Sequence, residues 1–112
     1  MTKLAHRECV PCRAGAPPIS DEKIALYQPE LHPDWMIVDR NRRLERVFSF
    51  PDFASALAFT NKVAAIAEKD RHHPTILTSY GRVKVKIWTM KIHALHDNDF
   101  ILAAKIDRIP RE

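Results

Sequence analysis

The feature that most constrains this sequence is a long, alanine-rich apolar stretch that ends in two histidines and a proline. Pro51 and Asp52 open it, and apolar residues then recur at three- and four-residue spacing to about Asp70, as in an amphipathic helix. The residues at this spacing are Phe53, Ala56, Leu57, Thr60, Val63, Ala64 and Ala67. The wide stripe predicts that this helix packs closely on a sheet. Because Pro74 forces His73 into extended geometry, the helix must end before it.

The two adjacent histidines are candidates for proton chemistry. Neighbouring residues of an extended segment point to opposite faces, so His72 and His73 cannot both be buried in one core. At least one of them should face a cleft or solvent. An imidazole, with an unperturbed pKa of about 6.5, exchanges a proton near neutral pH. By itself, however, the pair is equally typical of a polar helix exit.

A β-hairpin is predicted on each side of this helix. The first has strands at 35–38 and 44–50, rich in bulky apolar residues. The second has strands at 76–80 and 83–90, separated by Gly81. In the last strand, one set of residues alternates with another: Val83, Val85, Ile87 and Thr89 with Lys84, Lys86, Trp88 and Met90.

Two further helices complete the expected order α-β-β-α-β-β-α. Ser20 caps the first helix and Pro29 stops it, while the last runs over about 97–109. The fold class is therefore α+β, a four-stranded antiparallel sheet with helices packed on one face. The other face and the sheet edges are open to a second subunit.

Length and charge set further limits. A chain of 112 residues fits one domain over 1–112, with 1–19 as an irregular N-terminal lead-in. It has neither a membrane-spanning apolar run nor a signal peptide, so a soluble, cytoplasmic protein is expected. The net charge is +4, and the basic residues group into two clusters: Arg40, Arg42, Arg43 and Arg46, then Lys84, Lys86 and Lys91. Without a nucleic-acid motif, these clusters predict a solvated face or a surface for an acidic protein rather than nucleic-acid binding.

The lead-in contains one possible metal motif. His6, Cys9 and Cys12 have the spacing of three ligands, but a closed structural zinc site needs four and the chain has no other cysteine. We therefore expect no metal site here.

Several motifs around the histidines follow one known pattern. They are Glu68-x3-His72-His73-Pro74-x5-Tyr80, Val83-x-Val85-x-Ile87, Leu95, Asp99 and Leu102-Ala103. This pattern resembles the pterin-4a-carbinolamine dehydratase family, and Cys9-Val10-Pro11-Cys12 with Pro17-Pro18-Ile19 resembles its bacterial members. The resemblance implies a subunit that pairs strands across a homodimer, often doubled into a homotetramer. It also implies loss of water from 4a-hydroxytetrahydropterin, as in tetrahydrobiopterin recycling, with a pterin ligand and with no metal or organic cofactor.

The resemblance also assigns site residues. It makes His72 and His73 catalytic, and it places substrate-binding residues at five positions: Glu68, Pro74, Trp88, Thr89 and Asp99. Members of the family have a third histidine directly after the threonine, and here that position is Met90, whose thioether has no titratable proton. His93 lies three residues further on, so in an extended strand it would sit on the opposite face, roughly 10 Å away. Trp88 can equally be core packing, and Asp99 can equally be favouring a helix N-terminus.

Two functions follow from this departure at Met90. The main prediction is a non-catalytic protein of this family, acting as an assembly factor or chaperone for a client such as RuBisCO in α-carboxysome bacteria. The alternative is an active dehydratase, slowed by Met90 but sustained by His72 and His73.

Overall fold

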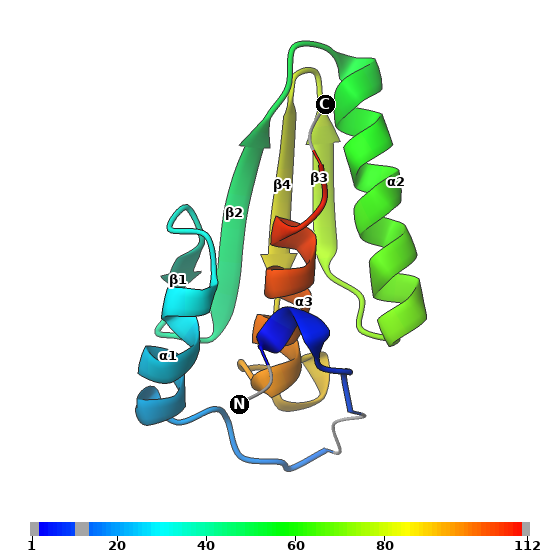
Figure 1. Ribbon diagram of the computed structural model, residues 1–112. Helices are drawn as coiled ribbons and strands as arrows, with labels where there is room; N and C mark the ends of the chain where they lie inside the picture. The colour runs from blue at the N-terminus through cyan, green and yellow to red at the C-terminus, as the bar shows by residue number, and fades with distance from the viewer. Residues whose placement is uncertain (1–2, 11–13, 111–112) are drawn as a thin grey trace.

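The computed structural model describes residues 3–10 and 14–110 (Figure 1). Its main elements are α1 (Asp21–Tyr27), β1 (Met36–Val38), β2 (Arg43–Ser49), α2 (Phe53–Asp70), β3 (Thr75–Ser79), β4 (Arg82–Ile87) and α3 (Asp97–Asp107). Three short 3-10 helices accompany them, at η1 (Leu4–His6), η2 (Gln28–Glu30) and η3 (Met90–Ile92). The strands form one antiparallel sheet in the order β1-β2-β4-β3. This confirms the predicted α+β class and the order α-β-β-α-β-β-α. Within the described residues, the helices are too short or too polar to cross a membrane.

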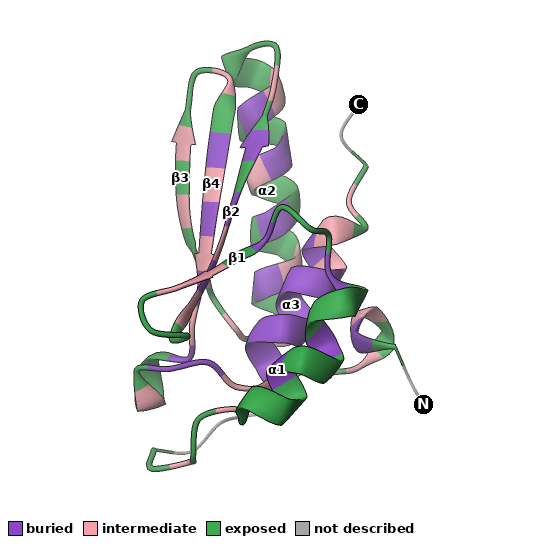
Figure 2. Ribbon diagram, turned by 90° about the vertical axis from the view of Figure 1, so that its left-hand side faces the viewer, coloured by how far each residue is buried: buried purple, intermediate pink, exposed green. Residues whose placement is uncertain are grey.

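The core lies between the sheet and the helices that cover one of its faces (Figures 1 and 2). Leu44 and Phe48 of β2 pair with Ile87 and Val83 of β4, and all four side chains are buried. They are the inward-facing members of two alternating strands, as the sequence predicted. The helices therefore pack on the buried side chains of the two central strands, β2 and β4.

Helix α3 is buried around most of its circumference (Figure 2). Its apolar side chains point both toward the sheet and away from it, so both sides need a cover. Tyr27 of α1 contacts Phe100 with ring centroids 5.8 Å apart, and Leu4 of η1 is buried as well. Residues 4–6 of the predicted lead-in thus form a short 3-10 helix that packs against the domain.

The buried face of α2 differs from the predicted stripe. Ala56, Val63 and Ala67 are buried as expected, and the fourth buried residue is Phe59, which the stripe omitted. Phe59 stacks against Phe48 at a centroid distance of 4.6 Å. Several predicted members, Phe53, Leu57 and Ala64, are exposed instead. Positions 56, 59, 63 and 67 are three or four residues apart and therefore lie on one face of the helix. The exposed members of the predicted stripe lie beside this buried face.

The predicted element ends also shift. Strand β4 stops at Ile87 rather than at Met90, since Met90 begins the turn of η3. Thr89 closes that turn through backbone hydrogen bonds with Ala94. The last helix ends at Asp107, two residues before the predicted end.

Four residues of the predicted basic clusters have partners within the domain. Arg46 is buried and binds Asp107 at 2.6 Å, and the guanidinium of Arg43 lies 4.4 Å above the ring of Trp88. Lys84 and Lys86 both approach Glu45. These four residues are therefore engaged within the domain, while Arg40, Arg42 and Lys91 of the two clusters are exposed.

Candidate functional site

The end of α2 sets the direction in which the two histidines leave the helix. Arg71 has left-handed geometry (φ +55°), and its N–H donates to the carbonyl of Glu68. The N–H of His72 donates to the carbonyl of Ala67 at 3.1 Å. Together these two bonds make a Schellman motif, which satisfies the last carbonyls and turns the chain sharply. Pro74 then keeps the exit extended, as predicted.

Because a non-glycine residue pays a steric cost in the left-handed region, Arg71→Gly is expected to stabilise the fold by about 1 kcal/mol. Arg71→Ala is the matched control, since it removes the same side chain and keeps the steric cost. Thermal unfolding of the two variants checks this. Equal melting temperatures would mean that the turn stores no strain.

His72 is held by a buried carboxylate. Its Nε2 lies 2.5 Å from Oδ1 of Asp99, whose side chain is fully buried. The other oxygen, Oδ2, accepts from the hydroxyl of Thr89 at 2.8 Å and from the N–H of His96 at 2.7 Å. Asp99, which the sequence assigned either to substrate binding or to the helix N-terminus, therefore holds His72 from behind the cleft.

This network fixes the proton on the histidine. Both oxygens of Asp99 act as acceptors, so Nε2 of His72 donates to Oδ1. Nδ1 is then the ring nitrogen that can accept a proton from a bound molecule or return one. A buried carboxylate behind an imidazole also holds the ring in one orientation, as in other acid–base sites. The arrangement is suited to proton transfer.

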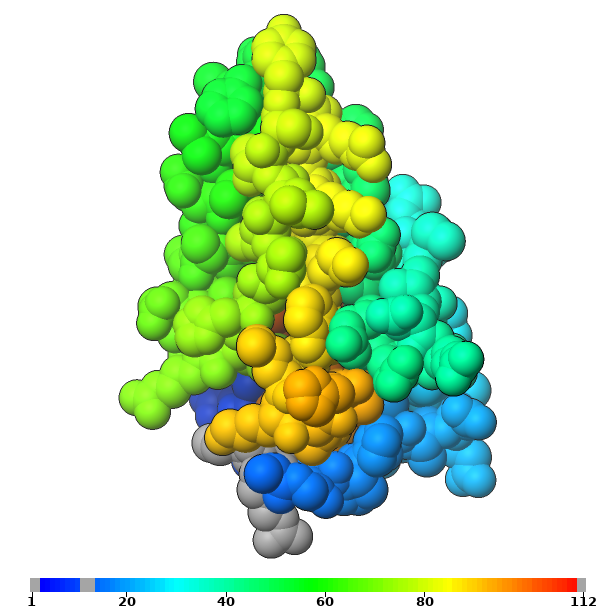
Figure 3. All heavy atoms as spheres, turned by 180° about the vertical axis from the view of Figure 1, so that it is seen from behind, coloured from blue at the N-terminus to red at the C-terminus, as the bar shows by residue number. Residues whose placement is uncertain are grey.

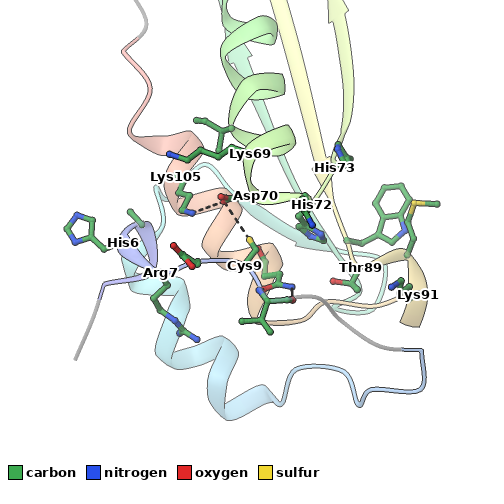
Figure 4. Close-up of a pocket in the computed structure, with 18 of the residues that line it drawn as sticks. His6, Arg7, Cys9, Lys69, Asp70, His72, His73, Thr89, Lys91 and Lys105 are labelled. Atoms are coloured by element: carbon green, nitrogen blue, oxygen red, sulfur yellow. Dashed lines mark hydrogen bonds and ion pairs between the residues drawn. The ribbon is translucent and has the colours of Figure 1, made fainter.

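An open cleft of about 1060 Å³ lies in front of this network (Figure 4). Four of the residues to which the resemblance assigned a role line it, namely His72, His73, Trp88 and Thr89, and so does Met90. The side chain of His72 is 13% exposed and that of His73 is 62% exposed, which confirms that the two imidazoles cannot share one core. Both nevertheless contribute to the cleft.

The remaining predicted site residues do not line the cleft. Asp99 acts from behind His72, and Pro74 lies in the extended exit. The side chain of Glu68 is exposed, and its carboxylate lies 3.5 Å from Nε2 of His73. Glu68 can therefore influence His73 without touching a molecule deep in the cleft.

Met90 and His93 lie in the η3 turn, where the two differ in position. Met90 is 68% exposed and lines the cleft. His93 has left-handed geometry (φ +50°), is exposed and does not line it. Its carbonyl accepts from Arg43 at 3.3 Å. His93 therefore does not bring an imidazole to the position of Met90, in agreement with the sequence.

One wall of the cleft was missed by the sequence analysis, and it comes from the lead-in (Figure 4). The amide of Asn98 holds it by accepting from the N–H of Val10 at 2.9 Å and donating to the carbonyl of the same residue. The thiol of Cys9 lies 3.7 Å from Asp70, and burial raises its pKa to about 12. Val10 and Asn98 are 88 positions apart, and no pattern of neighbouring residues in the sequence predicts that they are in contact.

The His6, Cys9 and Cys12 motif, at which we expect no metal site, lies only partly within the described residues. Cys12 lies outside the described residues. Within 3–10 and 14–110, no group of three or more His, Cys, Asp or Glu side chains is arranged to hold a metal ion.

Comparison with known proteins gives a consistent result. Residues 17–109 match the family model described as pterin 4 alpha carbinolamine dehydratase. A relative from Nitrosococcus oceani is 50% identical over 97% of both chains, and one from Alkaliphilus metalliredigens is 43% identical over 96% of both. Both carry the name pterin-4-alpha-carbinolamine dehydratase.

Two solved structures are also similar. A protein from Brucella melitensis, described as a transcriptional coactivator/pterin dehydratase, is 29% identical with a TM-score of 0.72, covering 80% of this chain and 95% of its own. A pterin dehydratase-like protein described as a RuBisCO assembly factor of the alpha-carboxysome is 25% identical with a TM-score of 0.58. That match covers 68% of this chain and 88% of the other.

These findings overturn the main functional prediction. The assembly factor is a more distant neighbour than the proteins named as dehydratases, which match nearly the whole chain at much higher identity. The prediction of a non-catalytic assembly factor relied on Met90 alone, and the network behind His72 is intact. That prediction is therefore wrong, and the chain belongs to the pterin-4a-carbinolamine dehydratase family.

Proposed function

We propose that this protein catalyses the dehydration of 4a-hydroxytetrahydropterin to the quinonoid dihydropterin. The observation that carries this proposal is the bond from His72, at the wall of the cleft, to the buried carboxylate of Asp99. The reaction breaks the bond between C4a and its hydroxyl oxygen. That oxygen gains a proton and leaves as water, while the adjacent ring nitrogen, N5, loses a proton. One proton is delivered and one is removed, which suits imidazoles because each can give or take a proton.

The residues of the cleft have separate roles in this scheme. His72 exchanges a proton through Nδ1, because Asp99 occupies its Nε2. His73 is the second imidazole, at the solvent-exposed rim, where it can exchange protons with water. Trp88 offers an aromatic face in the lining, and a flat heterocycle can pack there.

The proposal is tested by measuring turnover of 4a-hydroxytetrahydropterin, and Met90→His is the informative variant. We expect the wild type to exceed the rate in buffer. Met90→His should raise kcat by about tenfold or more, because it adds a titratable group at the mouth of the cleft. The imidazole of His93 already lies outside the cleft, so His93→Ala should leave the rate unchanged. A wild-type rate equal to that of buffer would refute the proposed function.

We further propose that the protein forms a homodimer or a homotetramer. The sheet face turned away from the helices is open, as Figure 3 shows, and β3 is an edge strand. Leu77 of β3 and Tyr80, in the turn that follows it, are 55% and 76% exposed. Exposed apolar side chains on a free edge favour pairing with another copy.

Light scattering after gel filtration should therefore give a mass of two or four chains. Leu77→Glu places a charge on this edge and is expected to shift the mass toward one chain. Phe53→Glu is a matched control, because Phe53 is also exposed but lies on α2. A monomeric wild type would contradict the proposal.

A further inference from the structure

The net positive charge of the protein is concentrated in the walls of the cleft. The lining contains six Lys or Arg residues: Arg7, Lys69, Arg71, Lys91, Lys105 and Arg108. It contains two acids, Glu8 and Asp70, which leaves +4 with histidines counted as neutral. The whole chain also carries +4. The residues outside the cleft therefore balance one another, and the excess lies where a ligand would bind.

Three of the six cations already have partners. Lys105 binds Asp70 at 2.7 Å, and Arg108 lies 2.8 Å from the ring of His6. Arg7 donates to the hydroxyl of Tyr27 and approaches Asp97.

The other three cations, Lys69, Arg71 and Lys91, form what we term the basic rim. Their side chains are exposed, and within the described part of the chain none has a hydrogen-bond or ion-pair partner. Asp70 is engaged by Lys105, and among the described residues Glu8 makes no ion pair with any of the three. The rim is thus a set of unpaired like charges around one cleft.

The rim is placed next to the candidate chemistry. Lys69 and Arg71 come just before His72 in the chain, and Lys91 follows Met90. In the view of Figure 4, Lys69 and Lys91 lie on either side of His72. Lys69 also complements the dipole at the end of α2. That explanation does not extend to Arg71, which has left the helix, or to Lys91, which lies in the η3 turn.

We propose that the cleft selects pterins whose side chain carries a negative charge, as a phosphate or a carboxylate. This inference rests on the proposed function, since the ring is the dehydratase substrate. A cleft lined by cations concentrates anions and gains most from a ligand that supplies the missing charge. A volume of about 1060 Å³ is at the upper end for small-molecule sites, so there is room for a side chain beyond the rings.

Fluorescence titration with oxidised pterins tests the proposal. The probes are neopterin, neopterin monophosphate and 6-carboxypterin. The wild type should bind the monophosphate about tenfold more tightly than neopterin, and added salt should reduce the difference because exposed charges are screened. If 6-carboxypterin also binds more tightly than neopterin, the basic rim recognises negative charge in general. If it does not, the basic rim recognises phosphate. Both results support the proposal.

The variants separate a local effect from general charge. Lys69→Gln/Arg71→Gln/Lys91→Gln should bring the ratio of the two affinities, for monophosphate and neopterin, close to one. The matched control, Arg40→Gln/Lys62→Gln/Arg82→Gln, removes the same charge outside the cleft and should keep the wild-type ratio. Equal affinity of the wild type for both probes would overturn the proposal. So would an equal loss of the ratio in the control variant.

The dehydratase assay, run with a neutral side chain on the substrate, separates the two proposals. Turnover of that substrate together with equal binding of both probes means that the charge inference fails and the dehydratase function stands. Tighter binding of the monophosphate without turnover means that the dehydratase function fails and the charge inference stands.

Discussion

Asp99→Asn is expected to reduce kcat for 4a-hydroxytetrahydropterin by about 10²–10⁴-fold while KM changes little. The reason lies in the donors around the carboxylate. Thr89 and the N–H of His96 both donate to Oδ2, so the carbonyl oxygen of the new amide must take that position. Its NH₂ group then faces His72 and donates to Nε2. The proton of His72 moves to Nδ1, and the nitrogen that should accept a proton from substrate is blocked.

Two further variants complete this experiment. His72→Ala removes the imidazole and should lower kcat to the same extent as Asp99→Asn, because both abolish the same proton transfer. Thr89→Val removes one donor to Asp99 and leaves the bond to His72, so its effect should be much smaller. A melting temperature close to that of the wild type shows that Asp99→Asn still folds. Wild-type kcat in a folded Asp99→Asn protein would exclude the proposed role of the carboxylate.

Local patterns predicted the elements of this fold. The spacing of apolar residues placed the long helix between two hairpins, and Pro74 placed the turn at which His72 and His73 diverge. The same patterns failed at residue 59, because several alanines nearby fit more than one helical stripe. They also failed at Arg46. An arginine is usually exposed, but this side chain is buried and forms an ion pair with Asp107.

The site depends on contacts that no local pattern contains. His72 meets Asp99 across 27 residues, and Val10 meets Asn98 across 88. These pairs form because the N-terminal end of α3 lies beside the C-terminal end of α2, which follows from packing of the whole core. Judging the site from Met90 alone gave that one position too much weight, since it lies at the exposed mouth of the cleft. The buried network behind His72 does not involve Met90.

The second large effect concerns stability: Asp107→Asn is expected to lower the free energy of unfolding by about 3 kcal/mol. Oδ1 of Asp107 accepts from Arg46 and from the indole N–H of Trp35, both at 2.6 Å, and Oδ2 accepts from the N–H of His32. The side chains of Arg46 and Asp107 are only 4% and 13% exposed. An asparagine leaves the guanidinium buried without a counter-charge.

Arg46→Met is the matched variant, and it should cost clearly less, about 1 kcal/mol. In that protein Asp107 still accepts hydrogen bonds from the indole N–H of Trp35 and the N–H of His32. Because its side chain is partly exposed, water can also donate to it. In Asp107→Asn, Arg46 has no other acceptor to replace the carboxylate, because its Nε already lacks a hydrogen-bond partner among the described residues. The introduced methionine also keeps a long apolar side chain beside the ring of Phe48, where the guanidinium now lies at 4.2 Å. Urea unfolding measures both free energies, and an equal loss in the two variants would contradict the view that the buried cation depends on this single carboxylate.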